Sequence, residues 1–267
     1  MKRIYLVCLL LAACAGSTTR TNAVRVLTYN IHAGKDAEQR PNIAEVAALI
    51  DASDADIVML QEVDRRTTRA GGADHFAELE QLTGMHAAFG KSLDYQGGDY
   101  GIAVLSRWPI DSATTVSLKV EPPQERSGVS HEPRVGLHVV VRAPSGSLHV
   151  LNTHIDAGGP GTYRRQEVIG LLARIRNAVP AGVPLVFGGD LNARPGTDEI
   201  AAVSLALTDA HAACGQGPGE TFPAHQPDRR IDYVFFRQAR CLHARVLDSD
   251  ASDHRPLLVT LEILRRP

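Results

Sequence analysis

Apolar residues recur along this chain in short runs, and most of the runs have the length and composition of β-strands. Ile57-Val58-Met59-Leu60 is an unbroken apolar run, which is typical of a strand buried on both faces. Ala143-Pro144-Ser145-Gly146 predicts a hairpin between two apolar stretches, and Gly97-Gly98-Asp99 predicts a turn before another strand. On this pattern we expect strands at residues 24–30, 56–62, 101–106, 135–142, 147–153, 185–187, 231–236 and 257–263.

Three segments instead carry apolar residues at the spacing of a helix, namely 42–52, 77–83 and 162–178. Asn42 and Glu45 stand where a capping box begins the first of these helices. Since strands outnumber helices, the pattern favours an α/β sandwich of two sheets with the helices outside.

The composition fits one large domain. The chain has 267 residues, 44% of them apolar, and no linker or repeat divides it after residue 24. We therefore expect a single domain at 24–267. The formal net charge is −2, so no electrostatic footprint of tight nonspecific nucleic-acid binding follows. The densest basic cluster, Arg65, Arg66 and Arg69, is typical of a solvated turn.

The first residues have the features of an export signal rather than of a folded domain. Lys2 and Arg3 precede an apolar stretch at 4–11, which falls short of the roughly 20 residues needed to span a bilayer. Leu11-Ala12-Ala13-Cys14 resembles the lipobox of bacterial lipoproteins. That resemblance implies lipidation of Cys14 and cleavage before it, and an ordinary secretory signal is the alternative.

The lipobox divides the chain into a signal peptide at 1–14, a flexible tether at 15–23 that is rich in Ser and Thr, and the domain. The protein would then be extracytoplasmic and anchored to a bacterial membrane through its lipid. Ala15 follows the cysteine, which by resemblance favours the outer membrane in a host with two membranes.

Two cysteines, Cys214 and Cys241, remain after the signal peptide. In an oxidising compartment they can form a disulfide, and two separate buried thiols are the alternative. No Cys-x-x-Cys or His-Glu-x-x-His segment is present, so the sequence lends no support to a zinc site.

Polar residues stand where the predicted apolar strands stop. Asn30, Glu62, His154 and Asp190 each close one such run. Ligand sites in sheet proteins tend to lie beyond strand ends. We therefore expect these side chains to converge on one site of carboxylates, amides and histidines.

Two further segments carry candidate chemistry. In Gly188-Gly189-Asp190-Leu191-Asn192, two glycines allow close backbone approach, and Asp190 and Asn192 point the same way on an extended segment. Asp232 lies within an apolar run and needs a partner, for which a histidine is suitable. Ser252-Asp253-His254-Arg255-Pro256 supplies such a histidine before the final strand.

Taken together and in order, seven segments resemble the endonuclease/exonuclease/phosphatase superfamily, which includes deoxyribonucleases, apurinic endonucleases, sphingomyelinases and inositol polyphosphate phosphatases. The resemblance covers nearly the whole chain after the signal peptide. It implies a four-layer αββα sandwich of two mixed β-sheets flanked by helices, with the site at one edge of the sheets. The segments are 28–31, 60–63, 101–109, 152–154, 189–192, 230–233 and 252–256.

The resemblance implies a divalent cation held by Glu62 with help from Asn30 and Asp253. Hydrolysis of a phosphoester builds negative charge on oxygen atoms, which a hard cation bound by oxygen ligands stabilises. Mg²⁺ fits this chemistry best, and Mn²⁺ and Ca²⁺ are the alternatives.

The resemblance also implies the residues that handle water and phosphate. Asp190 and Asn192 take the place of the pair that orients the attacking water and contacts the phosphate. His254, held by Asp232, takes the place of the catalytic histidine, and with a pKa near 6.5 it would accept the proton of water. His154 matches a second histidine, which would donate a hydrogen bond to a phosphate oxygen or protonate the leaving group.

These features predict a metal-dependent phosphoesterase that acts as a monomer on phosphodiesters. The substrate classes left open are nucleic acid, phospholipid headgroups and small phosphoesters. Arg134 is a weaker candidate for a phosphate contact, and His154 argues against the apurinic endonuclease branch. The competing hypothesis is a surface-binding lipoprotein that keeps the fold without the chemistry.

Overall fold

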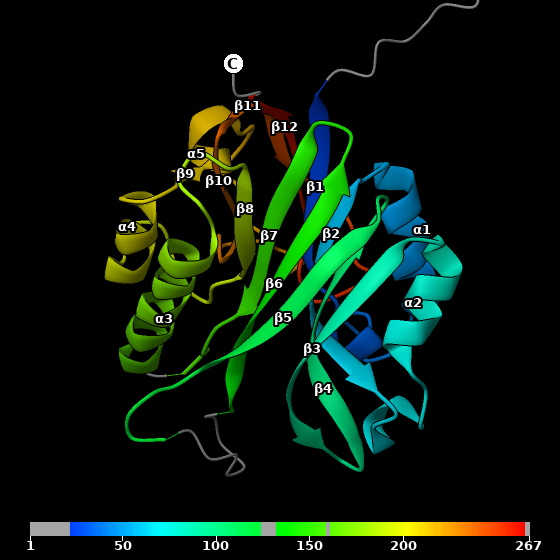
Figure 1. The fold of residues 1–267 in the computed structure, drawn as a ribbon. Coiled ribbons are helices and arrows are strands. Elements are labelled where there is room, and N and C mark those ends of the chain that lie inside the picture. The colour runs from blue at the N-terminus through cyan, green and yellow to red at the C-terminus, as the bar shows by residue number, and fades with distance from the viewer. Residues whose placement is uncertain (1–21, 124–131, 159–160, 265–267) are drawn as a thin grey trace, which may run out of the picture.

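Two six-stranded sheets form the centre of the protein in a computed structural model that describes residues 22–123, 132–158 and 161–264 (Figure 1). In spatial order the first sheet contains β11 (Ala239–Val246), β12 (Leu257–Ile263), β1 (Ala23–Asn30), β2 (Ile57–Arg65), β4 (Gly98–Ser106) and β3 (His86–Tyr95). The second contains β5 (Ile110–Leu118), β6 (Arg134–Ala143), β7 (Gly146–His154), β8 (Leu185–Asp190), β10 (Asp232–Arg237) and β9 (Thr208–Asp209). Both sheets are mixed, because β1 pairs with β2 and β7 with β8 in parallel while their other pairs are antiparallel.

The sheets face each other across an apolar core. Residues of β1, β2 and β4 from the first sheet meet residues of β6, β7 and β8 from the second, among them Met59, Leu137 and Val150. Strands in such a core are covered on both faces, which explains the unbroken apolar runs of the sequence.

Helices cover the outer faces of both sheets. The helix α1 (Ile43–Ser53) packs on the first sheet beside α2 (His75–Thr83), while α3 (Thr162–Ala178) and α4 (Asp198–Ser204) pack on the second. Figure 1 shows these pairs on opposite sides of the sandwich. The four-layer αββα arrangement predicted from the sequence is confirmed.

Three short helices complete the described elements: η1 (His32–Gly34), η2 (Thr68–Ala70) and α5 (Ala210–Cys214). A disulfide between Cys214 and Cys241 joins α5 to β11, so the first of the two alternatives for these cysteines is the one present.

The first helix begins at the predicted place without the predicted cap. Asn42 is its N-cap residue, but the side chain makes no capping hydrogen bond. Its amide instead donates to the carbonyl oxygen of Ala251, which lies in the loop before β12. The prediction of a capping box at Asn42 and Glu45 was wrong, because the hydrogen bond to Ala251 orients the side chain so that its Oδ1, the atom a cap requires, has no partner among the described residues.

The start of the chain was predicted to be a signal peptide and tether. Cys14 and residues 15–21 lie outside the described residues, and Ala23, the last residue of the predicted tether, already belongs to β1. Within the described ranges, no helix combines the length and the apolar character that crossing a membrane requires.

Candidate active site

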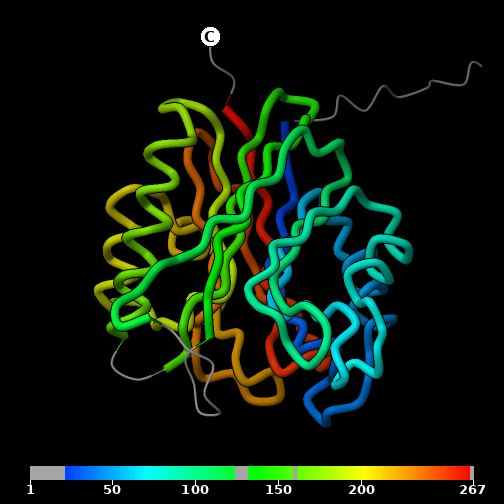
Figure 2. Tube along the Cα trace, turned by 60° about the horizontal axis from the view of Figure 1, so that its bottom comes forward, coloured from blue at the N-terminus to red at the C-terminus, as the bar shows by residue number. Residues whose placement is uncertain are grey.

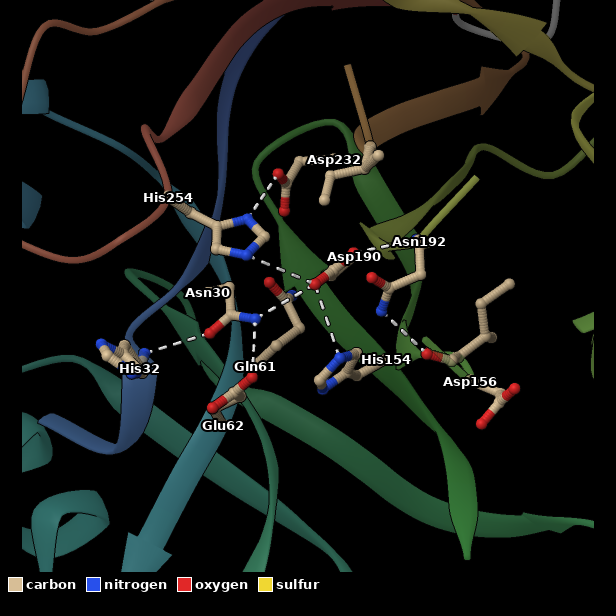
Figure 3. A network of polar contacts seen from close by, with 12 residues as sticks. Asn30, His32, Gln61, Glu62, His154, Asp156, Asp190, Asn192, Asp232 and His254 are labelled. Carbon is tan, nitrogen blue, oxygen red and sulfur yellow. Dashed lines mark hydrogen bonds and ion pairs between the residues drawn. The ribbon is translucent and has the colours of Figure 1, made fainter. Parts of the chain in front are cut away.

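Strand ends from both sheets meet at the edge of the sandwich opposite the start of β1. Asn30 ends β1, His154 ends β7, Asp190 ends β8 and Asp232 begins β10. The strand register places His154 and Asp232 on either side of Asp190. Figure 2 brings this edge forward, and Figure 3 shows the side chains pointing toward one another. The predicted convergence is therefore present.

Asp190 lies at the centre of the cluster and is 1% exposed. Its Oδ2 accepts a hydrogen bond from Asn30 Nδ2 at 3.1 Å, and lies 3.4 Å from His154 Nε2 and 3.7 Å from His254 Nε2. Its Oδ1 accepts a hydrogen bond from the backbone N–H of Asn192 at 2.9 Å. One carboxylate thus connects residues from four separate segments.

The surroundings raise the pKa of Asp190 to about 7. Burial is the largest cause, and the negative charge of Asp232 adds to it, while His254 and the hydrogen bonds from Asn192 and Asn30 oppose it. A carboxyl group with a pKa near 7 can both accept and release a proton at neutral pH.

His254 and Asp232 form the predicted pair. Asp232 Oδ2 is 2.8 Å from His254 Nδ1 and also accepts a hydrogen bond from Thr221 Oγ1 at 2.5 Å. His254 is 5% exposed, and the ring of Phe222 packs against it with centroids 4.7 Å apart. Asp232 therefore holds the imidazole at Nδ1, the ring of Phe222 packs against it, and Nε2 is directed at Asp190.

The pKa of His254 is raised to about 10. Burial acts to lower it, but attraction to Asp232, the hydrogen bond from the ring to that carboxylate, and the charges of Asp190 and Asp253 together outweigh burial. The expectation of a histidine near its ordinary pKa of 6.5 was wrong, because the sequence does not reveal how many carboxylates surround the ring.

His154 is in the opposite electrostatic state. Burial, the guanidinium of Arg134 and the charge of His254 hold the pKa of His154 well below its usual range. Arg134 Nη1 donates a hydrogen bond to His154 Nδ1 at 3.0 Å. The site thus contains one cationic and one neutral imidazole, both facing Asp190.

Glu62 reaches the site through a β-bulge and does not end its strand as predicted. β2 continues to Arg65, and its register against β4 shifts between Leu60 and Val63. Glu62 has a φ of 59°, in the left-handed region. This irregularity turns the side chain so that its Oε1 accepts a hydrogen bond from Asn30 Nδ2 at 3.1 Å.

Asp253 lies next to this group without touching Glu62 in any described contact. Its Oδ1 is 3.8 Å from His32 Nδ1 and 3.3 Å from Ser252 Oγ. Ser252 Oγ in turn donates to the carbonyl oxygen of Asn30 at 2.8 Å. The loop before β12 is therefore fastened to the end of β1, and all eight predicted site residues gather at one edge of the sandwich.

A model of the endonuclease/exonuclease/phosphatase family matches residues 27–254, a range that spans the site from Asn30 to His254. The chain belongs to this family. The resemblance seen in the seven sequence segments is thereby confirmed.

One relative of this chain is YbhP of Escherichia coli K12, a protein of uncharacterised function. The two are 28% identical over 258 residues, which cover 92% of this chain and 98% of YbhP. An endonuclease/exonuclease/phosphatase structure from Beutenbergia cavernae has a TM-score of 0.74 at 25% identity, covering 91% of this chain and 72% of that one. A mannosyl-6-phosphatase structure from Bacteroides thetaiotaomicron has a TM-score of 0.72 at 18% identity, covering 89% of this chain and 99% of that one. At this level of identity, the similarity to the mannosyl-6-phosphatase shows only that the two proteins share a fold.

Two groups of residues in the site contain atoms that could act as ligands of a cation. Among the described residues, Asp190, Asp232 and His254 have ligand atoms within 4.8 Å of one another. Both ring nitrogens of His254 already face carboxylates, Nδ1 that of Asp232 and Nε2 that of Asp190. Glu62 instead offers carboxylate oxygens, which are hard ligands that suit Mg²⁺. Asn30 lies beside it, with Nδ2 directed at Glu62 and Oδ1 accepting a hydrogen bond from the backbone N–H of His32. The residues present therefore fit a divalent ion on the Glu62 side.

The buried residues that support the active site from beneath were not predicted from the sequence. Gln61 Nε2 donates to Asn152 Oδ1 at 2.8 Å, and Asn152 Nδ2 donates at 2.8 Å to the carbonyl oxygens of both Leu60 and Ala103. This buried amide pair joins the two sheets beneath the site. Nothing in the local sequence identifies such contacts, because they form only when the two sheets pack.

The three clustered arginines do not form a free basic patch. Arg65 pairs with Asp74 at 3.0 Å, and Arg66 lies 3.4 Å from the same carboxylate. Arg69 makes two hydrogen bonds to the fully buried Asp64. Two carboxylates thus compensate two of the three positive charges, and the side chain of Arg66 is 73% exposed.

Proposed function

We propose that this protein is a divalent-cation-dependent hydrolase of phosphoester bonds, with phosphodiesters as its main substrates. The observation that carries the proposal is the position of Asp190. A single carboxylate with a pKa near 7 touches Asn30 and faces a cationic and a neutral histidine. Hydrolysis of a phosphoester needs these same elements, namely an acceptor for the proton of water and donors for the phosphate oxygens.

Glu62 and Asn30, with Asp253 nearby, would hold the cation. When bound, a divalent ion stabilises the negative charge that develops on the phosphate and leaving oxygens. Mg²⁺ is the ion we expect, since the donors are oxygen atoms, and Mn²⁺ is the natural substitute.

Asp190 is the residue that we assign to accepting the proton of the attacking water. The assignment moves this role away from His254, since a histidine with a pKa near 10 is already protonated at neutral pH. His254 then acts as a fixed positive donor that binds a phosphate oxygen through Nε2. Asp232 and Thr221 hold it in that orientation.

The electrostatics favour small or flexible phosphoesters over duplex nucleic acid. A protein that binds a duplex neutralises several phosphates with free Lys or Arg side chains, and two of the three clustered arginines of this chain are held by Asp74 and Asp64. A structural neighbour is named as a mannosyl-6-phosphatase, so phosphomonoesters belong in any substrate panel.

The proposal is tested by assaying the purified full-length protein on bis-p-nitrophenyl phosphate and p-nitrophenyl phosphate, with Mg²⁺ and with a chelator. We expect diester hydrolysis that the chelator abolishes and Mg²⁺ restores. Glu62→Gln should raise the Mg²⁺ concentration needed for half-maximal activity at least tenfold, and the exposed Glu80→Gln on α2 should leave it unchanged. Undiminished activity in excess chelator contradicts the role of the cation.

A further inference from the structure

Arg134 is the most deeply buried guanidinium beside the site. It is the first residue of β6 and is 5% exposed. Its Nη1 lies 3.0 Å from His154 Nδ1 and 2.9 Å from Glu132 Oε1. Its Nε is buried and makes no hydrogen bond among the described residues. A cation placed this deep, with one nitrogen unpaired, is costly to bury and calls for a functional explanation.

The contact fixes which nitrogen of His154 carries the proton. A guanidinium has only donors, so His154 Nδ1 must accept the hydrogen bond from Arg134. The proton of a neutral imidazole then has to reside on Nε2. That atom lies 3.4 Å from Asp190 Oδ2 and points to the centre of the site (Figure 3). The parallel register of β7 and β8, which pairs His154 with Asp190, holds the ring in place.

The same contact prevents His154 from taking a second proton. Protonation of Nδ1 would remove the acceptor of Arg134 and place two positive groups about 3 Å apart in a buried site, where charges interact strongly. A neutral imidazole gives up its Nε2 proton only to a very strong base, so His154 is a donor of a hydrogen bond and not of a proton.

We infer that Arg134 is a positioning residue that holds His154 as the neutral Nε2–H tautomer, so that His154 binds a nonbridging phosphate oxygen and does not protonate the leaving group. The inference rests on the proposed function and assigns the one role that the sequence left open between two alternatives. In the step, the oxygen of water bonds to phosphorus and its proton passes to Asp190. The ester P–O bond breaks, and its electron pair leaves on the departing oxygen, which takes a proton from bulk water, while Asp190 returns its proton to bulk water.

This assignment defines the class of ester that reacts fastest. Since His154 does not protonate the departing oxygen, the rate should depend on how well that oxygen carries a negative charge. Aryl esters and esters whose leaving group is itself a phosphate should therefore react faster than simple alkyl esters.

The tautomer is measured directly by NMR of the ¹⁵N-histidine-labelled full-length protein, with His154→Gln used to assign the signal. We expect Nε2 protonated and Nδ1 unprotonated in the wild type across neutral pH. Arg134→Lys, which keeps a cationic donor, should preserve this state. Arg134→Met should raise the pKa of His154 into the range where its titration is visible. A wild-type His154 that carries its proton on Nδ1, or on both nitrogens, overturns the inference.

The kinetic test uses bis-aryl phosphates whose leaving phenols span a range of pKa. We expect His154→Gln to lower kcat by a factor of about 10² on every ester, because it removes one donor to the phosphate. The exposed His86→Gln on β3 serves as the matched control and should have no effect. A loss that grows as the leaving group becomes poorer identifies His154 as a general acid and overturns the inference.

The two measurements separate this inference from the proposed function. If the NMR shows the Nε2–H tautomer but the wild type hydrolyses no phosphoester, the proposed function fails and the role of Arg134 in fixing the tautomer stands. If hydrolysis occurs but Nδ1 is protonated, the inference fails and the proposed function stands.

Discussion

At the scale of single residues, burial and neighbouring charge decide what each side chain of the site can do. The two histidines that face Asp190 are chemically identical in the sequence, yet one is next to a carboxylate and the other next to a guanidinium. The position of polar residues at the ends of apolar runs was enough to predict Asn30, His154 and Asp190. The partners Arg134 and Thr221 were not predictable as such, because they come from segments whose approach depends on the packed fold.

The raised pKa of His254 predicts a pH dependence of stability. Its pKa lies near 10 in the folded protein and near 6.5 when unfolded. The stabilisation of the folded state by the protonated His254 is therefore complete below pH 6.5, and it is lost as the pH rises from about 6.5 to 10. In Asp232→Asn, which removes the charge that holds the proton, the unfolding free energy should fall much less over this window. Urea denaturation at pH 6 and pH 9 measures the difference, and parallel pH profiles for the two proteins would contradict it.

At the scale of elements, burial decides which strands the sequence reveals. β12 and the buried part of β2 were predicted because their apolar runs are covered on both faces. The edge strands β3, β5 and β11 were missed, since one side of each faces solvent and their residues are mostly polar or exposed. The bulge in β2 was also invisible, because it depends on the pairing with β4.

Gly98 lies directly beyond the end of the pairing between β2 and β4, in close contact with β2. A Cβ atom at Gly98 would lie 2.2 Å from the carbonyl oxygen of Arg65, a backbone atom that cannot move aside. Gly98→Ala should lower the free energy of unfolding by about 2 kcal/mol or more. Because this pairing supports the bulge at Glu62, the variant should also lose activity at saturating Mg²⁺. Denaturation and steady-state assays measure the two effects.

Gly170→Ala on α3 is the matched control for Gly98→Ala. A Cβ at Gly170 makes only an ordinary contact, 3.6 Å from Leu118 Cδ2. Since alanine is the better helix former by about 1 kcal/mol, this variant should be as stable as the wild type or more stable. A Gly98→Ala protein as stable and active as Gly170→Ala would show that the pairing does not require glycine.

At the scale of the whole molecule, the site and the start of β1 lie at opposite ends of the sandwich. β1 runs from Ala23 at one end of the sandwich to Asn30 in the site, a length of about 23 Å for eight residues in a strand (Figure 1). If Cys14 is lipidated as the sequence predicts, the lipid would be attached through the tether to the end of the sandwich opposite the site.

The anchor itself is tested by labelling bacterial cells that produce the protein with radioactive palmitate. We expect the label in the wild type and in Cys8→Ser, whose substitution lies in the predicted signal peptide, and no label in Cys14→Ser. An unlabelled wild type would remove the anchor from the account and leave the proposed hydrolase unaffected.

The central claim is that Asp190 accepts the proton of water during phosphoester hydrolysis, and the most direct measurement is kcat of Asp190→Asn on bis-p-nitrophenyl phosphate at saturating Mg²⁺. The amide keeps the shape of the carboxylate and one of its two acceptor oxygens but cannot accept the proton of water, so we expect kcat to fall by a factor of about 10³. The exposed Asp198→Asn at the start of α4 should keep the wild-type rate. An Asp190→Asn enzyme that retains more than a tenth of the wild-type kcat would contradict the account.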